Sequence, residues 1–138
     1  MNKFLSVALV AYLTCAAPAF AISDADDQRL NNGEGCPGCD LSYANLLGRN
    51  LSNQDLSGAN FTGTNLIGAG FYNANLTDAN LTDANLSDAN LTNTNLTRAN
   101  LTGANLSRIH PLNIEGATFT NTLFCNTTWI DGTLRPCP

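Results

Sequence analysis

The sequence predicts an all-β solenoid, and two observations lead to this prediction. A Leu or Phe recurs at every fifth position from residue 41 to residue 106 without a slip. The residue two positions before each is usually small, most often Ala, and the residue directly before it is Asn or Asp, with Gly70 as the exception. A period of five matches neither the helical repeat of about 3.6 residues nor the two-residue repeat of a strand. Each unit is too small to form a core alone, so successive turns must stack.

The residues from Ala74 to Leu91, A-N-L-T-D-A-N-L-T-D-A-N-L-S-D-A-N-L, closely resemble the pentapeptide-repeat family. This resemblance implies a right-handed quadrilateral β-helix in which four five-residue units make one square coil. It also implies that the Leu or Phe and the small residue point inward, whereas the other three positions face solvent. Members of the family include DNA gyrase inhibitors that mimic DNA and many lumenal or periplasmic proteins of no assigned role. The resemblance therefore implies a fold and only loosely a function.

The first 21 residues are predicted to be a secretory signal. Lys3 supplies a positive charge, an apolar stretch follows, and Ala19-Phe20-Ala21 matches an A-x-A cleavage site, so we expect the mature chain to begin at Ile22. The apolar stretch is shorter than the about 20 residues of a membrane span, and no stable membrane insertion is expected after cleavage. A lipoprotein modified at Cys15 and a retained anchor are less favoured alternatives. The signal predicts export to a periplasm or a thylakoid lumen.

The segment after the signal, residues 22–38, is predicted to be an N-terminal cap that contains a short helix. Ser23 and Asp26 form an S-x-x-D capping pattern, and Gly33 is a suitable stop, so the expected helix covers residues 23–32. A solenoid needs such a cap because its first coil exposes apolar interior and unpaired backbone groups.

Four cysteines remain after removal of the signal: Cys36, Cys39, Cys125 and Cys137. An even number in an exported chain favours disulfides over metal or redox chemistry. Three pairings are possible in principle, but several coils of about 4.8 Å each would hold the two ends farther apart than the roughly 7 Å that a disulfide spans. We therefore expect the local pairs, Cys36 with Cys39 and Cys125 with Cys137. A redox-active or metal-binding Cys36-Pro37-Gly38-Cys39 motif is a less favoured alternative, because it lacks a following helix, a βαβ context and a second cysteine pair at zinc-site spacing.

The regular solenoid is predicted to cover residues 39–108, with two irregular units near its start. Arg49 and Gln54 occupy positions where a small inward residue is expected. A buried, unpaired Arg would be costly. We expect either a local bulge or side chains that escape to solvent beside the cap, and we favour this adjustment over a binding site.

Residues twenty apart are expected to stack on one face of the coil. This places Asp78 under Arg98 and Asp88 under Arg108, as exposed ion pairs. The same rule stacks Leu47 with Ile67 at a position that is otherwise mostly Ser or Thr, with Tyr43 and Tyr72 elsewhere on the same coils. An exposed apolar patch can mark a partner site, so these four residues form the candidate partner surface.

The final segment, residues 109–138, is predicted to hold phase-shifted repeats and a C-terminal cap. Ile109-His110-Pro111 interrupts the pattern, and eight residues instead of five then separate Leu106 from Ile114. The pattern continues with large inward residues at Phe119, Phe124, Trp129 and Leu134. Phe124-Cys125 and the turn Asp131-Gly132-Thr133 resemble the C-terminal segment of exported cyanobacterial and chloroplast-lumen members of the family.

The sequence carries no recognisable catalytic, cofactor-binding or metal-binding cluster. The single His, His110, lies beside a proline without Ser, Cys or Asp arranged as a triad, and Asp78, Asp83 and Asp88 fall on three different faces. We therefore predict a non-enzymatic structural or protein-interaction module with an unknown protein partner and without a cofactor or a nucleic-acid ligand.

Two alternatives from other classes remain. A DNA mimic that inhibits gyrase is disfavoured by export and by a modest charge, since loss of Lys3 changes the formal charge only from −5 to −6. A surface that binds an ordered lattice such as ice would use the hydroxyl column of Ser42, Thr62, Thr82 and Thr102. Hydroxyls at this position are typical of the whole family, so this alternative is the weakest.

Overall fold

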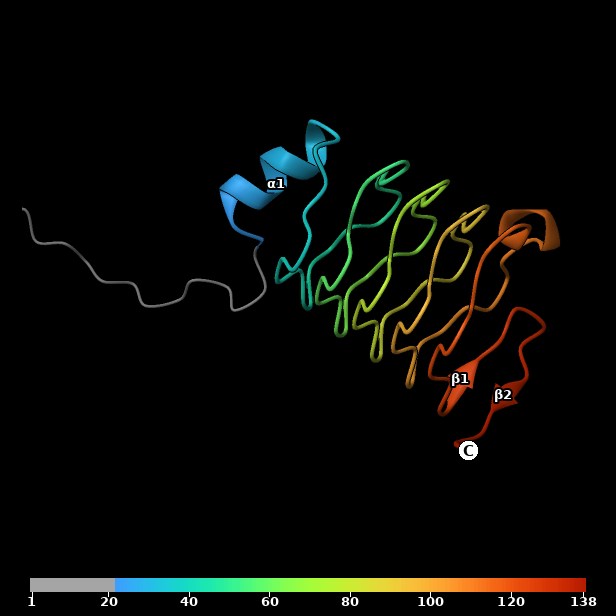
Figure 1. Cartoon of the computed structure of the whole chain (residues 1–138). Helices are drawn as coiled ribbons and strands as arrows, with labels where there is room; N and C mark the ends of the chain where they lie inside the picture. Colours follow the sequence, from blue (N-terminus) through green and yellow to red (C-terminus); the bar gives the residue numbers. More distant parts are fainter. Residues whose placement is uncertain (1–21) are drawn as a thin grey trace, which may run out of the picture.

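The computed structural model describes residues 22–138, and the predicted signal, Met1–Ala21, lies outside these described residues. The chain winds into a stack of coils with a helix at one end and a short hairpin at the other (Figure 1). The named elements are α1 (Asp24–Asn31), the 3-10 helix η1 (Pro111–Ile114), β1 (Thr127–Thr128) and β2 (Leu134–Arg135). Isolated parallel bridges between residues twenty apart, such as Asp40 with Asn60, join each coil to the next.

The core is the column of Leu and Phe side chains that the five-residue period places inside the coil. Each of these residues from Leu41 to Leu106 is at most 1% exposed. Where Thr replaces Ala in the neighbouring small position, its hydroxyl is bonded to the backbone: Thr64 donates to the Leu41 carbonyl and Thr94 to the Phe71 carbonyl, both at 2.7 Å. A buried hydroxyl is tolerated there because it has a partner.

Several of the Asn residues that precede an inward Leu or Phe link the coils through their side chains. Asn60 accepts a hydrogen bond from the Thr62 N–H at 3.1 Å and donates through Nδ2 to Asp40 Oδ1, one coil earlier, at 3.0 Å. The residue two positions after each inward residue adopts a positive φ, for example 61° at Asn53 and 58° at Arg98. Gly, Asn and Asp dominate this position because they tolerate that conformation best.

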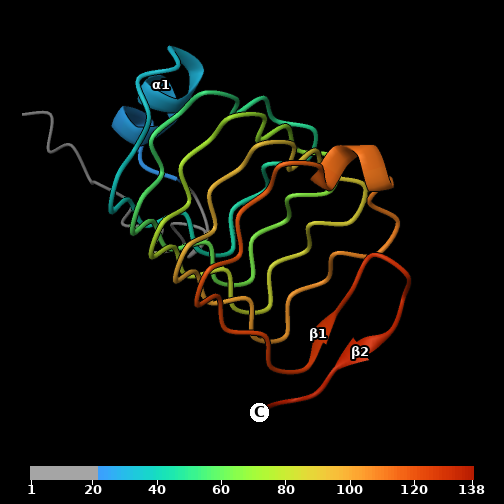
Figure 2. The same cartoon turned by 45° about the vertical axis from the view of Figure 1, so that its right-hand side comes forward.

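The irregular corner after Ser107 shifts the register of the stack without breaking it. Bridges join residues twenty apart up to Asn85 with Asn105, whereas Asn95 pairs with Thr118 and Asn100 with Leu123, which are 23 apart. This confirms the three-residue shift. The extra residues are taken up at η1, which stands out from the side of the stack (Figure 2).

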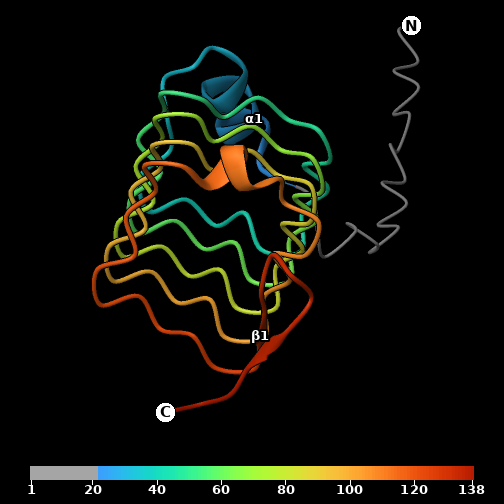
Figure 3. The same cartoon turned by 90° about the vertical axis from the view of Figure 1, so that its right-hand side faces the viewer.

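The chain leaves the solenoid before Leu134, and the prediction of an inward Leu134 is wrong. Leu134 is 61% exposed and belongs to β2, which pairs antiparallel with β1. Asp131 accepts hydrogen bonds from the Thr133 N–H and hydroxyl at 2.9 and 2.6 Å, and this turn reverses the chain. A strand that runs back along β1 cannot also start a new coil. Figure 3 shows this hairpin at the C-terminal end of the stack.

An aromatic cluster fills the C-terminal end of the coil. The rings of Phe119, Phe124 and Trp129 are half-buried, and their centroids lie 5.5–5.7 Å apart. The guanidinium of Arg135, carried by β2, lies 3.9 Å from the centroid of the Trp129 ring. This cation–π contact shields part of the last layer from water.

Candidate functional site

Helix α1 begins with a capping arrangement that fixes the Asp26 carboxylate. The Ser23 hydroxyl oxygen accepts a hydrogen bond from the Asp26 N–H at 3.1 Å, and the hydroxyl donates to Asp26 Oδ2 at 2.7 Å. One carboxylate oxygen of Asp26, Oδ2, is therefore held by the cap, while the other, Oδ1, is directed elsewhere. Near the other end of the helix, Leu30 is 1% exposed.

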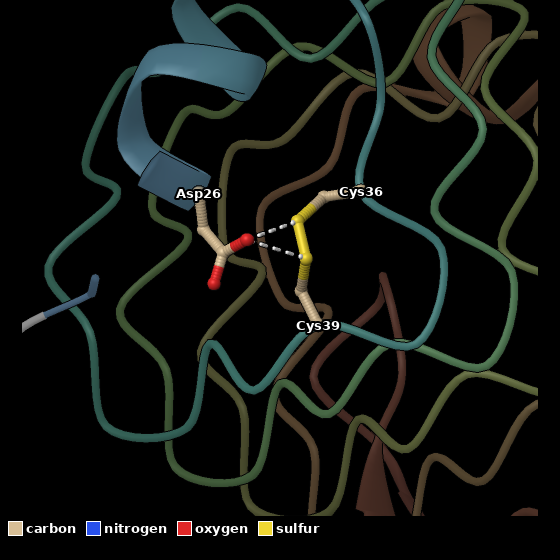
Figure 4. Close-up of side chains that lie close together, drawn as sticks. All are labelled: Asp26, Cys36 and Cys39. Carbon is tan, nitrogen blue, oxygen red and sulfur yellow. Dashed lines mark hydrogen bonds between the residues drawn. A yellow bond between two sulfur atoms is a disulfide. The ribbon is translucent and has the colours of Figure 1, made fainter. Parts of the chain in front are cut away.

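That second oxygen lies against both cysteine sulfurs of the first coil (Figure 4). Asp26 Oδ1 is 3.4 Å from Cys36 Sγ and 3.2 Å from Cys39 Sγ. The two sulfurs are joined as a disulfide, and a second disulfide joins Cys125 with Cys137. Cys36 is completely buried and Cys39 is 8% exposed. The sequence does not reveal this cluster, because the S-x-x-D pattern accounts for Asp26 fully as a capping residue.

The cluster also has the spacing of a metal site. The ligand atoms of Asp26, Cys36 and Cys39 all lie within 4.8 Å of one another. Zinc is bound by thiolates rather than by a disulfide, so the oxidised pair does not supply the ligands that the spacing would allow.

Arg49 and Gln54 attach α1 to the coils. Arg49 forms an ion pair with Asp27 Oδ1 at 2.9 Å and donates to the Asp27 carbonyl at 3.1 Å and to Asn31 Oδ1 at 2.8 Å. Gln54 is 4% exposed and donates through Nε2 to the Leu30 carbonyl at 3.0 Å. Of the two adjustments expected for these units, a local bulge or escape to solvent, escape is wrong for Gln54, because the last turn of α1 supplies a carbonyl that needs a donor.

A hollow of about 340 Å³ lies beside these contacts. The end of α1 forms one side of it, and Arg49, Ser52 and Gln54 form part of the other. Gln54 Oε1 is a buried acceptor without a hydrogen-bond partner. The hollow is thus lined mostly by polar residues, and Arg49 and Gln54, which replace the small residues of a regular unit, are among them.

The four residues of the candidate partner surface do not form one patch. Leu47 is 61% exposed and stacks one coil before Ile67, which is half-buried. Tyr72 is 44% exposed in the following unit. Tyr43 is 55% exposed in the unit before Leu47, and its ring lies against Gly63. The structure brings together Leu47 and Ile67, which we call the apolar ladder.

The predicted ion pairs are present on the outer surface. Arg98 binds Asp78 at 2.6 Å and Arg108 binds Asp88 at 2.7 Å. The hydrogen bond from each Arg lowers the pKa of its Asp carboxyl below the usual value. The negative charge of each of these two acids is therefore balanced by the positive charge of an Arg one coil away.

The hydroxyl column is used internally. The hydroxyls of Thr62, Thr82 and Thr102 donate to the Asn two residues earlier, at 2.6, 2.6 and 2.7 Å. His110 is likewise occupied, since its Nδ1 accepts the Leu112 N–H at 3.2 Å at the start of η1. In the part of the chain from residue 22 onward, no helix is long and apolar enough to cross a membrane.

Comparison with protein families identifies the repeat. The family model described as Pentapeptide repeats matches in 8 copies over residues 38–71, 49–83 and 69–108. Together these matches extend from residue 38 to residue 108, about half of the chain. No curated protein matches the sequence.

Several solved structures are similar. A pentapeptide repeat protein from the Arabidopsis thaliana thylakoid lumen is 32% identical with a TM-score of 0.65, and the alignment covers 73% of this chain and 68% of that protein. QnrB1, a plasmid-mediated fluoroquinolone resistance protein, is 26% identical with a TM-score of 0.50 over 64% of this chain. This chain spans only 39% of QnrB1. The pentapeptide repeat protein Rfr23 of the cyanobacterium Cyanothece is 38% identical over 65% of this chain and 60% of its own, with a TM-score of 0.35.

Proposed function

Since this chain belongs to the pentapeptide-repeat family, we propose that it is a non-enzymatic protein-interaction module of an exported compartment. Its rigid stack presents flat outer faces on which side chains keep fixed spacings. A partner would be recognised by such a face, because the interior of the coil is occupied by the buried column of Leu and Phe side chains.

The apolar ladder is the observation that supports this proposal. Leu47 exposes 61% of its surface at a position where the repeat usually places Ser or Thr. Ile67 extends the ladder by one coil. The residues that directly follow Leu47 and Ile67 are Gly48 and Gly68, which have no side chain and leave the ladder accessible. The area is small, so the ladder would act as the apolar centre of a larger, mostly polar contact.

The exported location rests on three supports. The predicted signal precedes the described residues, the four remaining cysteines are paired in two disulfides, and a similar protein comes from a thylakoid lumen. Periplasm and lumen are both oxidising compartments in which such bonds persist.

The two alternatives have less support. A DNA mimic needs repeated acids along one face, yet Asp78 and Asp88 are each paired with Arg. A lattice-binding surface needs hydroxyls that face water, yet those of Thr62 and Thr82 donate to neighbouring Asn side chains. Neither property favours these functions over protein binding.

The test is affinity isolation with the signal-processed protein as bait from the fractionated compartment. Leu47→Asp and Ile67→Asp should each remove the captured partner, because a charge in the apolar centre of an interface is costly to desolvate. Thr97→Asp is the matched control, since it places the same charge at the same repeat position on the opposite face. Equal capture by the wild type and both ladder variants would refute the proposed surface.

A further inference from the structure

We propose that Cys36 and Cys39 form a reversible thiol–disulfide exchange site whose reduced state is stabilised by Asp26 of α1. This goes beyond the proposed partner surface and does not depend on it. The co-reactant is a dithiol, either a small molecule or a protein that carries two neighbouring thiols. The inference rests on the contact of one carboxylate oxygen with both sulfurs (Figure 4).

The contact has a different meaning in the two oxidation states. A disulfide has no S–H group, so the approaches of 3.4 and 3.2 Å from Cys36 and Cys39 to Asp26 Oδ1 are not hydrogen bonds when the pair is oxidised. Within residues 22–138, Oδ1 lies against these two sulfurs, while the Ser23 hydroxyl donates to the other oxygen, Oδ2. After reduction, each thiol can donate to Oδ1. Reduction therefore creates hydrogen bonds to a charged acceptor that the oxidised state lacks.

The charge of the carboxylate affects the rate of exchange rather than its equilibrium. A negative group this close to both sulfurs opposes ionisation of either thiol. It therefore slows the attack of a thiolate in reoxidation and also the departure of a thiolate in reduction. The stabilisation of the reduced state comes from the hydrogen bonds that the thiols donate to Asp26 Oδ1.

The exchange proceeds through the more exposed of the two cysteines. A thiolate of the dithiol attacks Cys39 Sγ, which is 8% exposed, and forms a mixed disulfide while Cys36 leaves as a thiolate and takes up a proton. The second thiol of the co-reactant then attacks its own sulfur in the mixed disulfide and releases Cys39, which is protonated in turn. Overall, two electrons and two protons pass from the dithiol to the cysteine pair, and the dithiol becomes a disulfide.

The exchange is coupled to the N-terminal cap, because Asp26 belongs to α1 whereas the cysteines belong to the first coil. If docking of α1 favours the dithiol, the dithiol must favour docking of α1 to the same extent. The oxidation state would thus set how firmly α1 is held on the coil.

The first test uses the protein of residues 22–138. It measures the equilibrium between the disulfide and the dithiol of Cys36–Cys39 in dithiothreitol buffers. The thiols are trapped by alkylation and counted by mass spectrometry. We expect Asp26→Ala to need at least a tenfold higher ratio of reduced to oxidised dithiothreitol for half-reduction of Cys36–Cys39. Asp26→Asn keeps an acceptor for the Ser23 hydroxyl and should shift the ratio in the same direction, whereas Asp24→Asn removes a neighbouring charge and should leave it within twofold.

The second disulfide, Cys125–Cys137, is the internal reference because it is distant from Asp26. A shift of less than twofold in both Asp26 variants would overturn the proposal. An equal shift of Cys125–Cys137 would also overturn it, since that result would reflect a general loss of stability rather than a local contact.

The second test measures docking of α1 by the rate of tryptic cleavage after Arg29, in a Cys125→Ser, Cys137→Ser background. Reduction of the remaining pair should slow this cleavage at least threefold, because the thiols then bind Asp26. Faster cleavage after reduction would show that the pair is a structural brace of the cap and would contradict the proposed coupling.

Discussion

Replacing Arg49 with Ala should release α1 from the coils while leaving the solenoid folded. The change removes the ion pair with Asp27 and the hydrogen bonds to the Asp27 carbonyl and to Asn31. The side chains of the ion pair are 22% and 43% exposed, so the pair contributes at most about 1 kcal/mol. The two hydrogen bonds from a charged donor add about 1 kcal/mol after allowance for solvent. The expected loss is therefore about 2 kcal/mol of docking free energy.

Trypsin reports this loss directly, because Arg29 lies inside α1 and is followed by Leu30, which is 1% exposed. Cleavage requires local opening, and about 2 kcal/mol corresponds to an increase of about 30-fold in the open population. Arg98→Ala is the matched control, since it breaks an exposed ion pair of the same type far from α1 and should not change this rate. An increase below threefold in Arg49→Ala would refute the assigned role of Arg49.

Three further predictions concern the solenoid itself. Thr94→Val should lower the free energy of unfolding by about 1 kcal/mol in urea titrations, because the bond to the Phe71 carbonyl is lost; an unchanged midpoint would contradict this. Leu81→Ala should cost about 2–5 kcal/mol by the same measurement, since the residue is completely buried, and a smaller cost would mean that the coils close over the cavity. The hydroxyl and N–H of Ser57 lower the pKa of Asp55, so the ionised carboxyl stabilises the fold above about pH 4 and this contribution disappears as the pH falls through the lowered pKa. The free energy of unfolding of Asp55→Asn should accordingly fall less between pH 5 and pH 2 than that of the wild type. An equal fall in both proteins would contradict a stabilising role of the ionised Asp55 carboxyl.

Features that follow from periodicity could be predicted from the sequence. The inward column, the stacking of Asp78 with Arg98, and the three-residue shift at the irregular corner are all set by counting residues along the chain. Counting works because every unit repeats the same backbone geometry, so the position of a residue in its coil fixes its neighbours one coil away.

Features that depend on the ends of the solenoid could not be predicted in this way. The bond from Gln54 to the Leu30 carbonyl joins residues 24 apart through the docking of α1, and no repeat encodes that distance. The contact of Asp26 with the cysteine pair arises in the same manner. At the other end, Leu134 keeps the phase of the repeat but lies in β2, because a hairpin turn replaces the next coil. Tertiary contacts of the caps therefore override the period.

The aromatic cluster at the C-terminal end gives this molecule a built-in optical reporter. Trp129 is its single tryptophan and lies in the last layer of the stack under the Arg135 guanidinium. Its fluorescence emission reports that layer alone, whereas far-UV circular dichroism reports all coils. In a molecule whose layers contact only their neighbours, a change in emission at lower denaturant than the change in dichroism would mean that the stack comes apart from the C-terminal end first. Coincident transitions would mean that the coils unfold as one cooperative unit.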